Sequence, residues 1–281
     1  MKLVTFTHNG RTQLGELDGD TVHALSVPDT LRMAELLRRG FTPTRVSQRY
    51  PLEKVTLRAP LHPGKIIAVG RNYAAHAAET GSDLPTAPLL FAKFPSAVIG
   101  PGEAITWDAS ITTEVDWEGE LGVVIGRTAR HVSEADALKY VFGYTVANDV
   151  TARDLQLRID AQWTRAKSLD TFCPLGPCIV TRSEIPDPQA LTITTTVNDQ
   201  TMQHGSTADM VFSVAHLVSY CSRMFTLEPG DLILTGTPPG VGEGMDPKTY
   251  LKDGDVVSVT ISGIGTLTNP CRALTADPPA S

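Results

Sequence analysis

The chain has 281 residues, of which 41% are hydrophobic and 20% charged, as in ordinary soluble globular proteins. This length allows one large domain with an appendage, or two modest domains. Lysine and arginine number 24 and aspartate and glutamate number 31, so the formal net charge is −7. Without a basic stripe in the sequence, nucleic acid and anionic membranes are poor candidates for the main partner.

The sequence also argues against a membrane or secretory protein. No apolar run approaches the roughly 20 residues of a membrane-spanning helix, and the first residues turn polar too early for a signal peptide. We therefore expect a soluble, cytoplasmic protein. The spacing of the four cysteines does not match a zinc ribbon, and we expect all four to be reduced and mostly buried. They are Cys173, Cys178, Cys221 and Cys271.

The first 60 residues are predicted to form a small module. Residues 2–6, 12–17 and 21–25 have the composition of short strands separated by Asn, Asp and Gly turns. Residues 30–39 have helical periodicity and end at Gly40. A cluster of Pro and Gly at residues 60–64 then favours a boundary. The predicted division is residues 1–60, a small N-terminal module; residues 61–274, the main domain; and residues 275–281, a polar tail.

The main domain is predicted to be mostly β. Its strand candidates are rich in Val, Ile and Thr and are bounded by Gly, Pro and Asp. They cover residues 66–70, 88–94, 97–100, 113–126, 140–150, 178–181, 191–198, 231–236, 256–261 and 265–269. Helices are predicted only near residues 72–79, 133–138 and 208–224. Strands with occasional helices indicate an α+β fold with a mainly β core, and not an alternating parallel α/β fold.

One predicted strand, residues 113–126, carries four acidic side chains at every second position. Side chains alternate between the faces of a strand, so Glu114, Asp116, Glu118 and Glu120 are expected on one face, roughly 6.5–7 Å apart. Carboxylates this close repel one another unless they are solvated, protonated, paired or bridged by a cation. A solvated polar face on an edge strand is the plainer interpretation, and the strand alone does not exclude it.

A further carboxylate strengthens the alternative of a metal site. Asp149 lies at the end of the strand predicted at residues 140–150, and strand ends with their loops are where functional sites tend to form. Glu118, Glu120 and Asp149 would together offer three hard oxygen ligands. Such a set suits Mg²⁺ or Mn²⁺, which keep coordination positions open for water and substrate oxygens.

Several motifs in fixed order resemble the catalytic domain of the fumarylacetoacetate hydrolase family. The resemblance spans about residues 65–269, and within the family it is strongest to acylpyruvases and fumarylpyruvate hydrolases. The motifs are Gly70-Arg71-Asn72-Tyr73-x-x-His76-x-x-Glu79, Phe91-x-Lys93-x-Pro95-Ser96, Asp116-Trp117-Glu118-x-Glu120-Leu121, Asn148 to Asp154, Lys167 to Pro177, and Gly230 to Gly242.

The resemblance implies a fold, a cofactor and a ligand set. Glu118, Glu120 and Asp149 become the metal ligands, with Mg²⁺ the usual ion and Mn²⁺ a common substitute. The implied fold is a mixed β-sandwich roll, usually assembled as a homodimer. The first 60 residues resemble the small module that often precedes this domain, and we find no chemistry in them.

Three further positions are implied to be catalytic. His76 and Glu79 are three residues apart, so on a helix they share a face and can form a hydrogen bond, although most such pairs are surface pairs. A glutamate beside a histidine raises its basicity, as a base that activates water requires. The resemblance makes these two the catalytic pair, on a segment that orders over substrate. It also implies that Lys167 lies beside the metal and stabilises an enolate oxygen.

The remaining candidates are expected to bind substrate. Arg153 and Gln156 could orient a carboxylate or the metal ligands, since a guanidinium matches a carboxylate in shape. A salt bridge with Asp154 or Asp170 is the structural alternative for Arg153. Thr237, in a Gly-rich turn, is expected to present its hydroxyl to a substrate carboxylate. Arg71, Tyr73 and Lys93 are additional pocket candidates.

The leading hypothesis is hydrolysis of a carbon–carbon bond in a 2,4-dioxo acid, an acylpyruvate such as fumarylpyruvate, to give pyruvate and a carboxylic acid. Two alternatives would use the same platform: decarboxylation of oxaloacetate, or isomerisation of an unsaturated 2-oxo acid of the 2-hydroxyhepta-2,4-diene-1,7-dioate type. A non-catalytic metal-binding or scaffolding protein is the hypothesis from another class. The substrate is in each enzymatic case a small 2-oxo or 2,4-dioxo acid.

Overall fold

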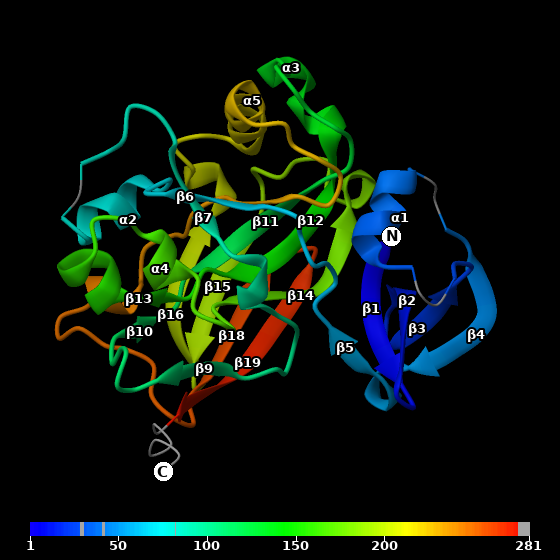
Figure 1. Ribbon diagram of the computed structural model, residues 1–281, viewed down its shortest axis with the longest axis horizontal. Coiled ribbons are helices and arrows are strands. Elements are labelled where there is room, and N and C mark those ends of the chain that lie inside the picture. Colours follow the sequence, from blue (N-terminus) through cyan, green and yellow to red (C-terminus); the bar gives the residue numbers. More distant parts are fainter. Residues whose placement is uncertain (29–30, 41–42, 82, 275–281) are drawn as a thin grey trace, which may run out of the picture.

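The computed structural model describes residues 1–28, 31–40, 43–81 and 83–274, and strands dominate it (Figure 1). A twelve-stranded sheet runs in the order β4-β3-β2-β1-β14-β12-β11-β17-β6-β7, with β5 beside β1 and β8 beside β14. Its strands are β1 (Lys2–His8), β2 (Arg11–Asp18), β3 (Thr21–Leu25), β4 (Arg45–Pro51), β5 (Thr56–Arg58), β6 (Ile66–Gly70), β7 (Leu89–Lys93), β8 (Val98–Ile99), β11 (Gly119–Ile125), β12 (Val141–Asn148), β14 (Cys173–Thr181) and β17 (Leu232–Leu234).

Two smaller sheets and five α-helices complete the described fold. The five-stranded sheet has the order β16-β15-β18-β19-β9, and β10 pairs with β13. These strands are β9 (Ile105–Asp108), β10 (Val115–Asp116), β13 (Thr151–Ala152), β15 (Thr192–Val197), β16 (Gln200–Ser206), β18 (Val256–Ile261) and β19 (Gly265–Leu274). The helices are α1 (Met33–Arg39), α2 (Ala74–Glu79), α3 (Glu134–Ala137), α4 (Thr164–Lys167) and α5 (Val214–Met224). The predicted α+β class with a mainly β core is confirmed.

The central strand β11 separates two hydrophobic cores. Leu121 and Val123 point to the core that β11 shares with the five-stranded sheet, where they meet Val257 and Val259 of β18. Val124 points to the opposite core, which includes residues of α1. All seven residues of β11 are buried, as expected for a strand covered on both faces. This double burial holds the β11 backbone, and the side chains at its start, in a fixed position.

The N-terminal strands are joined to the larger sheet. The three strands predicted within residues 1–25 are confirmed as β1, β2 and β3, and β1 pairs antiparallel with β14, Leu3 opposite Ile179. In Figure 1 this blue part of the chain lies to one side of the remaining strands. The boundary at residues 60–61 stays a prediction, and the predicted tail at residues 275–281 lies outside the described residues.

The predicted helices are present, with different limits. The helix predicted at residues 208–224 begins only at Val214, because the hydroxyl of Ser213 accepts a hydrogen bond from the backbone N–H of His216 (3.1 Å) and caps the helix there. The helix predicted at residues 30–39 is α1, which ends at Gly40 in a left-handed conformation (φ +67°); position 30 lies outside the described residues.

The continuous strand predicted at residues 113–126 is wrong. The chain forms β10, leaves the ladder at Trp117 and Glu118, and resumes as β11. The reason is a change of partner: β10 pairs with β13, whereas β11 pairs with β12 and β17. Because the segment is two strands and not one, acidic residues at every second position need not lie on one face of a sheet.

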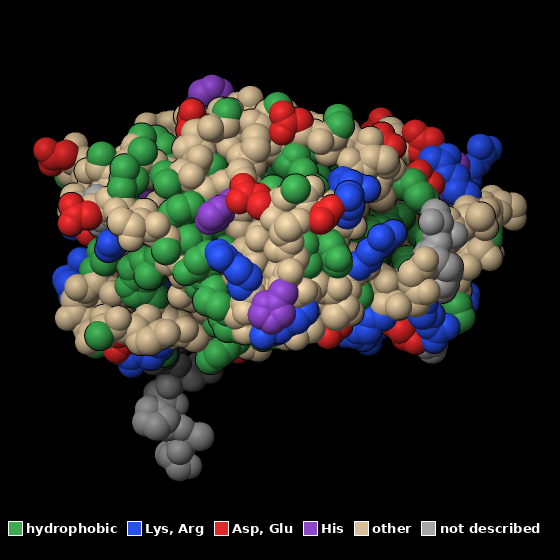
Figure 2. All heavy atoms as spheres, turned by 90° about the horizontal axis from the view of Figure 1, so that it is seen from above, with side chains coloured by type: hydrophobic (Ala, Val, Ile, Leu, Met, Phe, Trp, Pro, Cys, Tyr) green, Lys and Arg blue, Asp and Glu red, His purple; other side chains and the backbone are tan. Residues whose placement is uncertain are grey.

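The surface charges, the cysteines and the helix lengths can each be compared with what the sequence predicted. The face seen in Figure 2 mixes acidic and basic side chains instead of gathering one sign into a patch. All four cysteines are free and buried, as predicted. Within the part of the chain that the structure describes, no helix is long and apolar enough to cross a membrane.

We predict that Gly143→Ala destabilises the sandwich. A Cβ at Gly143 would lie 2.2 Å from the carbonyl oxygen of Val180, which is backbone and cannot move aside without separating β12 from β14. We expect the free energy of unfolding, measured by urea denaturation, to fall by about 1–3 kcal/mol. Thr201→Ala on the exposed side of β16 is the control and should change it by less than about 0.5 kcal/mol. Equal midpoints for both variants would contradict the prediction.

Candidate metal centre and active site

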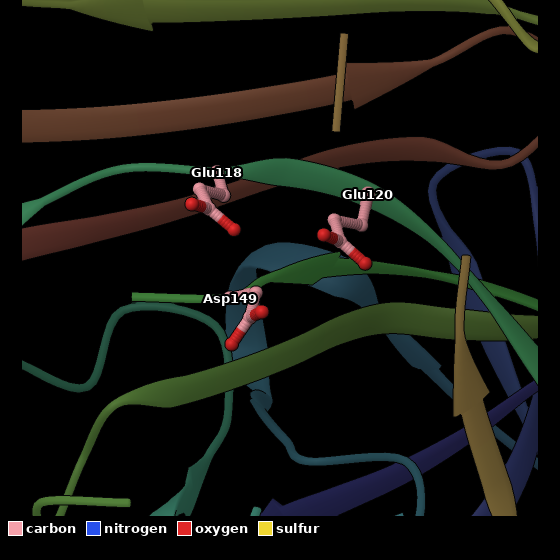
Figure 3. A group of neighbouring side chains, drawn as sticks. All are labelled: Glu118, Glu120 and Asp149. Atoms are coloured by element: carbon pink, nitrogen blue, oxygen red, sulfur yellow. The ribbon is translucent and has the colours of Figure 1, made fainter. Parts of the chain in front are cut away.

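Strand pairing brings three carboxylates together at one end of β11. Gly119 lies opposite Asn148 in the antiparallel β11–β12 pair, and the backbone N–H of Asp149 donates to the carbonyl of Glu118 (2.8 Å). This register sets Asp149 beside Glu118 and Glu120, although about thirty residues separate them in sequence. One oxygen of each carboxylate lies within 4.8 Å of the other two, and Figure 3 shows the three side chains as neighbours, with Glu118 and Glu120 side by side.

The chemistry of this carboxylate triad (Glu118, Glu120 and Asp149) fits a divalent metal. All three residues are buried, with 5%, 1% and 0% exposure. Three buried carboxylates destabilise one another electrostatically unless cations offset their charge. Burial, together with the charges of Asp149 and Glu118, raises the pKa of Glu120 well above its usual range. Oxygen donors of this kind match hard divalent cations and not softer metals.

Two buried lysines compensate part of this charge. The Nζ of Lys167 donates to Glu118 Oε2 (2.7 Å) and to Asp149 Oδ2 (2.8 Å), and Lys93 pairs with Asp149 Oδ1 (2.6 Å). Burial raises the pKa of Glu118, but the charges of Lys167 and Arg153 outweigh this and lower it to about 2.

Glu120 is the triad member without a basic partner. It forms no ion pair within the described chain; its Oε2 accepts a hydrogen bond from the backbone N–H of Gly236 (2.8 Å). The lysines therefore leave one carboxylate of the triad uncompensated, which is compatible with an additional cation.

The other two acidic residues of the segment point elsewhere, so the predicted common face is only half right. Asp116 accepts a hydrogen bond from Arg153 Nε (2.7 Å), and Glu114 forms an ion pair with Arg158. Arg153 also reaches Glu118 Oε1 (2.7 Å). Arg153 therefore does form salt bridges, but with Asp116 and Glu118 and not with the expected Asp154 or Asp170.

A cavity of about 240 Å³ opens beside the triad. His76 and Glu79 of α2 line it together with Glu118, Glu120 and Lys167. His76 Nδ1 and Glu79 Oε1 are 2.8 Å apart, which leaves the imidazole Nε2 unused by this pair. The second carboxylate oxygen of Glu79 accepts from the backbone N–H of Gly240 (2.9 Å). The hydrogen-bonded pair of His76 and Glu79 therefore lines the same small cavity as two carboxylates of the triad.

The six predicted substrate-binding residues have different surroundings. Arg71, Arg153, Gln156 and Thr237 line the cavity, with Gln156 accepting from Arg153 Nη1 (2.9 Å). The hydroxyl of Thr237 donates to the carbonyl of Gly119 (2.9 Å) and accepts from Gln203 Nε2 (2.7 Å), so the protein itself already uses it.

Tyr73 and Lys93 are buried behind the cavity wall. Lys93 Nζ contacts Asp149 and the carbonyls of Val150 (3.2 Å) and Lys167. The hydroxyl of Tyr73 has no hydrogen-bond partner among the described residues. Burial, with a contribution from the charge of Glu120, raises its pKa.

Sequence reasoning missed the aromatic wall of the cavity. Trp163 stacks under the guanidinium of Arg71 (5.6 Å) and meets the edge of Phe91 (5.5 Å between ring centroids), while Lys167 lies over Phe91 (5.1 Å). Phe91 is part of a recognised motif, but Trp163 lies in none. Gly70 is required at its position because a Cβ there would lie 2.6 Å from the Trp163 ring. A glycine in the sequence indicates a close contact but does not tell which residue makes it.

Comparison with known proteins identifies similar sequences and structures. The family model "Fumarylacetoacetate (FAA) hydrolase C-terminal" matches residues 65–272, and "Rv2993c-like, N-terminal" matches residues 1–60. The chain is 47% identical over 224 residues to oxaloacetate tautomerase YisK of Bacillus subtilis, which covers 78% of this chain and 74% of that protein.

Two solved structures share the fold over almost the whole length. A fumarylacetoacetate hydrolase from Exiguobacterium antarcticum has a TM-score of 0.86 at 40% identity and covers 98% of this chain and 100% of its own. A 2-hydroxyhepta-2,4-diene-1,7-dioate isomerase from Mycobacterium marinum has a TM-score of 0.82 at 38% identity, covering 97% and 98%. The resemblance seen in the sequence is thereby confirmed.

We predict that Glu120→Gln weakens Mn²⁺ binding by at least about tenfold to a hundredfold, since even residues that only support metal ligands have effects of this size. The amide keeps the shape of the side chain but replaces a carboxylate, which a metal would bind in its charged form, with a neutral group. Isothermal titration calorimetry with Mn²⁺ and Mg²⁺ measures the effect. Glu103→Gln, which changes a carboxylate paired with Arg58 away from the triad, is the control. Unchanged affinity in the Glu120 variant would exclude the triad as the metal site.

Proposed function

Because this chain belongs to the fumarylacetoacetate hydrolase family, we propose that it catalyses metal-assisted proton transfer in a small 2-oxo acid, the interconversion of the enol and keto forms of oxaloacetate. The observation that supports this most is that the His76–Glu79 pair lines the same small cavity as the carboxylate triad. An acid–base group facing a chelating site is what proton transfer next to a carbonyl requires.

The relatives and the size of the cavity favour this reaction over hydrolysis. The names of the B. subtilis and M. marinum proteins describe a tautomerase and an isomerase, both of which move a proton within a substrate. The leading expectation from sequence was hydrolysis of an acylpyruvate, and the isomerase alternative now has the better support. A cavity of about 240 Å³ is below the usual range for drug-sized ligands and suits a four-carbon acid.

The proposed reaction has simple atom balance. The O–H bond on C2 of the enol breaks and a C–H bond forms on C3. A divalent metal, Mg²⁺ or Mn²⁺, would supply Lewis-acid polarisation of the oxygen on C2, and Glu118, Glu120 and Asp149 are the residues that would hold it. The proton on that oxygen leaves to water. Lys167, whose ammonium lies against the triad, would donate a hydrogen bond to the oxygen while it is negatively charged.

His76 is proposed to deliver a proton from Nε2 to C3 and to take its replacement from water, which balances the proton that the oxygen on C2 releases to water. With Nδ1 held by Glu79, its Nε2 is the nitrogen available to the substrate, and Glu79 would stabilise the imidazolium before the transfer. Arg71, Arg153 and Gln156 are the proposed contacts for the carboxylates of the substrate. The homodimer and the cytoplasmic location belong to the same proposal, as properties inferred from the family and the sequence.

Hydrolysis is the second candidate, since the E. antarcticum structure carries the name of a hydrolase at 40% identity. The His76–Glu79 pair could activate a water molecule in the same position. Decarboxylation of oxaloacetate differs from both in releasing CO₂. The three reactions therefore differ in their products.

We predict that the protein accelerates the loss of enol absorbance when enol-oxaloacetate is dissolved in buffer with Mg²⁺ or Mn²⁺. Chelation of the metal by EDTA should abolish the acceleration, and excess Mn²⁺ should restore it. Pyruvate and CO₂ are measured in the same samples and should stay at the level without protein. Stoichiometric pyruvate from oxaloacetate would indicate a decarboxylase, and faster turnover of fumarylpyruvate or acetylpyruvate a hydrolase; either result contradicts the proposal.

We also predict that His76→Asn lowers kcat by about 10²- to 10⁴-fold, the usual contribution of a general acid–base group. The affinity for Mn²⁺ should stay within about threefold, because His76 is not one of the triad. His216→Asn is the matched control and should keep the original rate, because this partly exposed histidine pairs with Glu134 and does not line the cavity. A His76 variant with the original kcat would refute the role of this residue.

A further inference from the structure

Asp116 is a buried carboxylate with a complete set of hydrogen bonds and no place in the triad. Its exposure is 0%. Oδ1 accepts from the backbone N–H groups of Trp117 and Gly242, both at 2.8 Å. Oδ2 accepts from Arg153 Nε (2.7 Å) and from the backbone N–H of Glu243 (3.0 Å). Two of the four donors belong to one distant segment, residues 240–244, here called the glycine loop.

The neighbouring residue holds the other half of the glycine loop. Trp117 Nε1 donates to the carbonyl of Gly240 (3.0 Å). The fit is close, because a Cβ at Gly242 would lie 1.7 Å from the carbonyl oxygen of Thr249 and 2.9 Å from Asp116 Oδ1. Asp116 and Trp117 immediately precede Glu118 in the chain, so the segment that supplies a triad carboxylate also fixes this loop.

The opposite side of the glycine loop contacts Glu79. The backbone N–H of Gly240 donates to Glu79 Oε2 (2.9 Å), and a Cβ at Gly244 would lie 2.8 Å from Glu79 Cδ. The other oxygen of Glu79 is the one bonded to His76. The direction of the His76–Glu79 hydrogen bond therefore depends on where the loop lies.

Helix α2 is too short to hold the His76–Glu79 geometry without contacts to other segments. It comprises six residues, and its N-cap, Tyr73, makes no side-chain cap hydrogen bond. A helix this short is unstable unless tertiary contacts hold it. The contact between Glu79 and the glycine loop is such a contact.

We propose that Asp116, helped by Trp117, is a positioning residue: it fixes the glycine loop, which in turn fixes Glu79 and so orients His76 toward the triad. The inference rests on the proposed function in one respect, that His76 and Glu79 are the acid–base pair. The chain of contacts runs from Glu118 through Arg153 and Asp116 to the loop and α2. It couples the orientation of the dyad to the segment that carries the triad.

Hydrogen–deuterium exchange tests the coupling without any assay of activity. In Asp116→Asn, whose amide donates where the backbone needs an acceptor, we expect faster exchange in residues 240–244 and also in residues 74–79. Asp231→Asn is the matched control: Asp231 is likewise buried and accepts from the backbone N–H groups of Lys65 and Glu228, but it lies away from α2. The control should leave residues 74–79 unchanged. Faster exchange of the loop alone in the Asp116 variant overturns the coupling.

Kinetics then separates positioning from metal binding. We expect kcat of Asp116→Asn to fall about tenfold to a hundredfold, as for residues that orient a site from outside, with KM and the calorimetric Mn²⁺ affinity within about threefold. Gly244→Ala should produce the same pattern, because its methyl group displaces only the flexible end of Glu79. A parallel loss of Mn²⁺ affinity in the Asp116 variant would instead make it a support of the triad and overturn the proposal.

A double-mutant cycle tests whether Asp116 affects kcat through Glu79. If Asp116 acts through Glu79, adding Asp116→Asn to Glu79→Gln should lower kcat by less than about threefold more, because residues that share one interaction are not additive. Full additivity contradicts the proposal. Failure of the tautomerase assay with the unaltered protein would remove the proposed function, while the exchange experiment would still decide whether the loop positions α2.

Discussion

The site depends on the register between β11 and β12. The hydrogen bond from the Asp149 N–H to the Glu118 carbonyl (2.8 Å) sets the carboxylate at the end of one strand against the two at the start of its neighbour. A shift of one residue would turn Glu118 and Glu120 to the opposite face. The burial of β11 on both faces opposes that shift, because a shift would exchange the side chains that fill the two hydrophobic cores. The two cores therefore hold the triad together.

Such a concentration of buried charge is unfavourable for folding by itself, and the neighbours show how the fold tolerates it. Lys167 and Lys93 lie against the triad, and Arg153 joins Glu118 to Asp116. Buried ion pairs seldom add net stability, since desolvation cancels most of their attraction. Their retention is more easily explained by function: they hold Glu118 and Asp149 close together, while Glu120 has no ion-pair partner among the described residues, an arrangement compatible with a hard cation.

Much of the fold and of the site was visible in the sequence, for local reasons. Strand propensity, Gly and Pro turns and the stop of α1 at Gly40 are encoded in adjacent residues, and they gave the class and the N-terminal strands correctly. Motif order pointed to Glu118, Glu120 and Asp149, which lie together in the structure. It also pointed to His76 and Glu79, whose catalytic role stays a prediction. Errors arose where a partner far away decides the structure. β10 ends because it pairs with β13, and β16 (Gln200–Ser206), a polar strand in a hairpin turned by Asn198 and Asp199, was missed.

The sequence by itself determined which residues could carry chemistry: oxygen donors at alternating positions, a histidine three residues from a glutamate, and a run of family motifs. Only the tertiary structure decided their neighbours. It paired Asp116 with Arg153 and the glycine loop, set Trp163 under Arg71, and enclosed Lys93 behind the cavity. The physical reason is that side-chain type follows from the chain locally, whereas hydrogen bonds and ion pairs form between segments that only packing brings into contact.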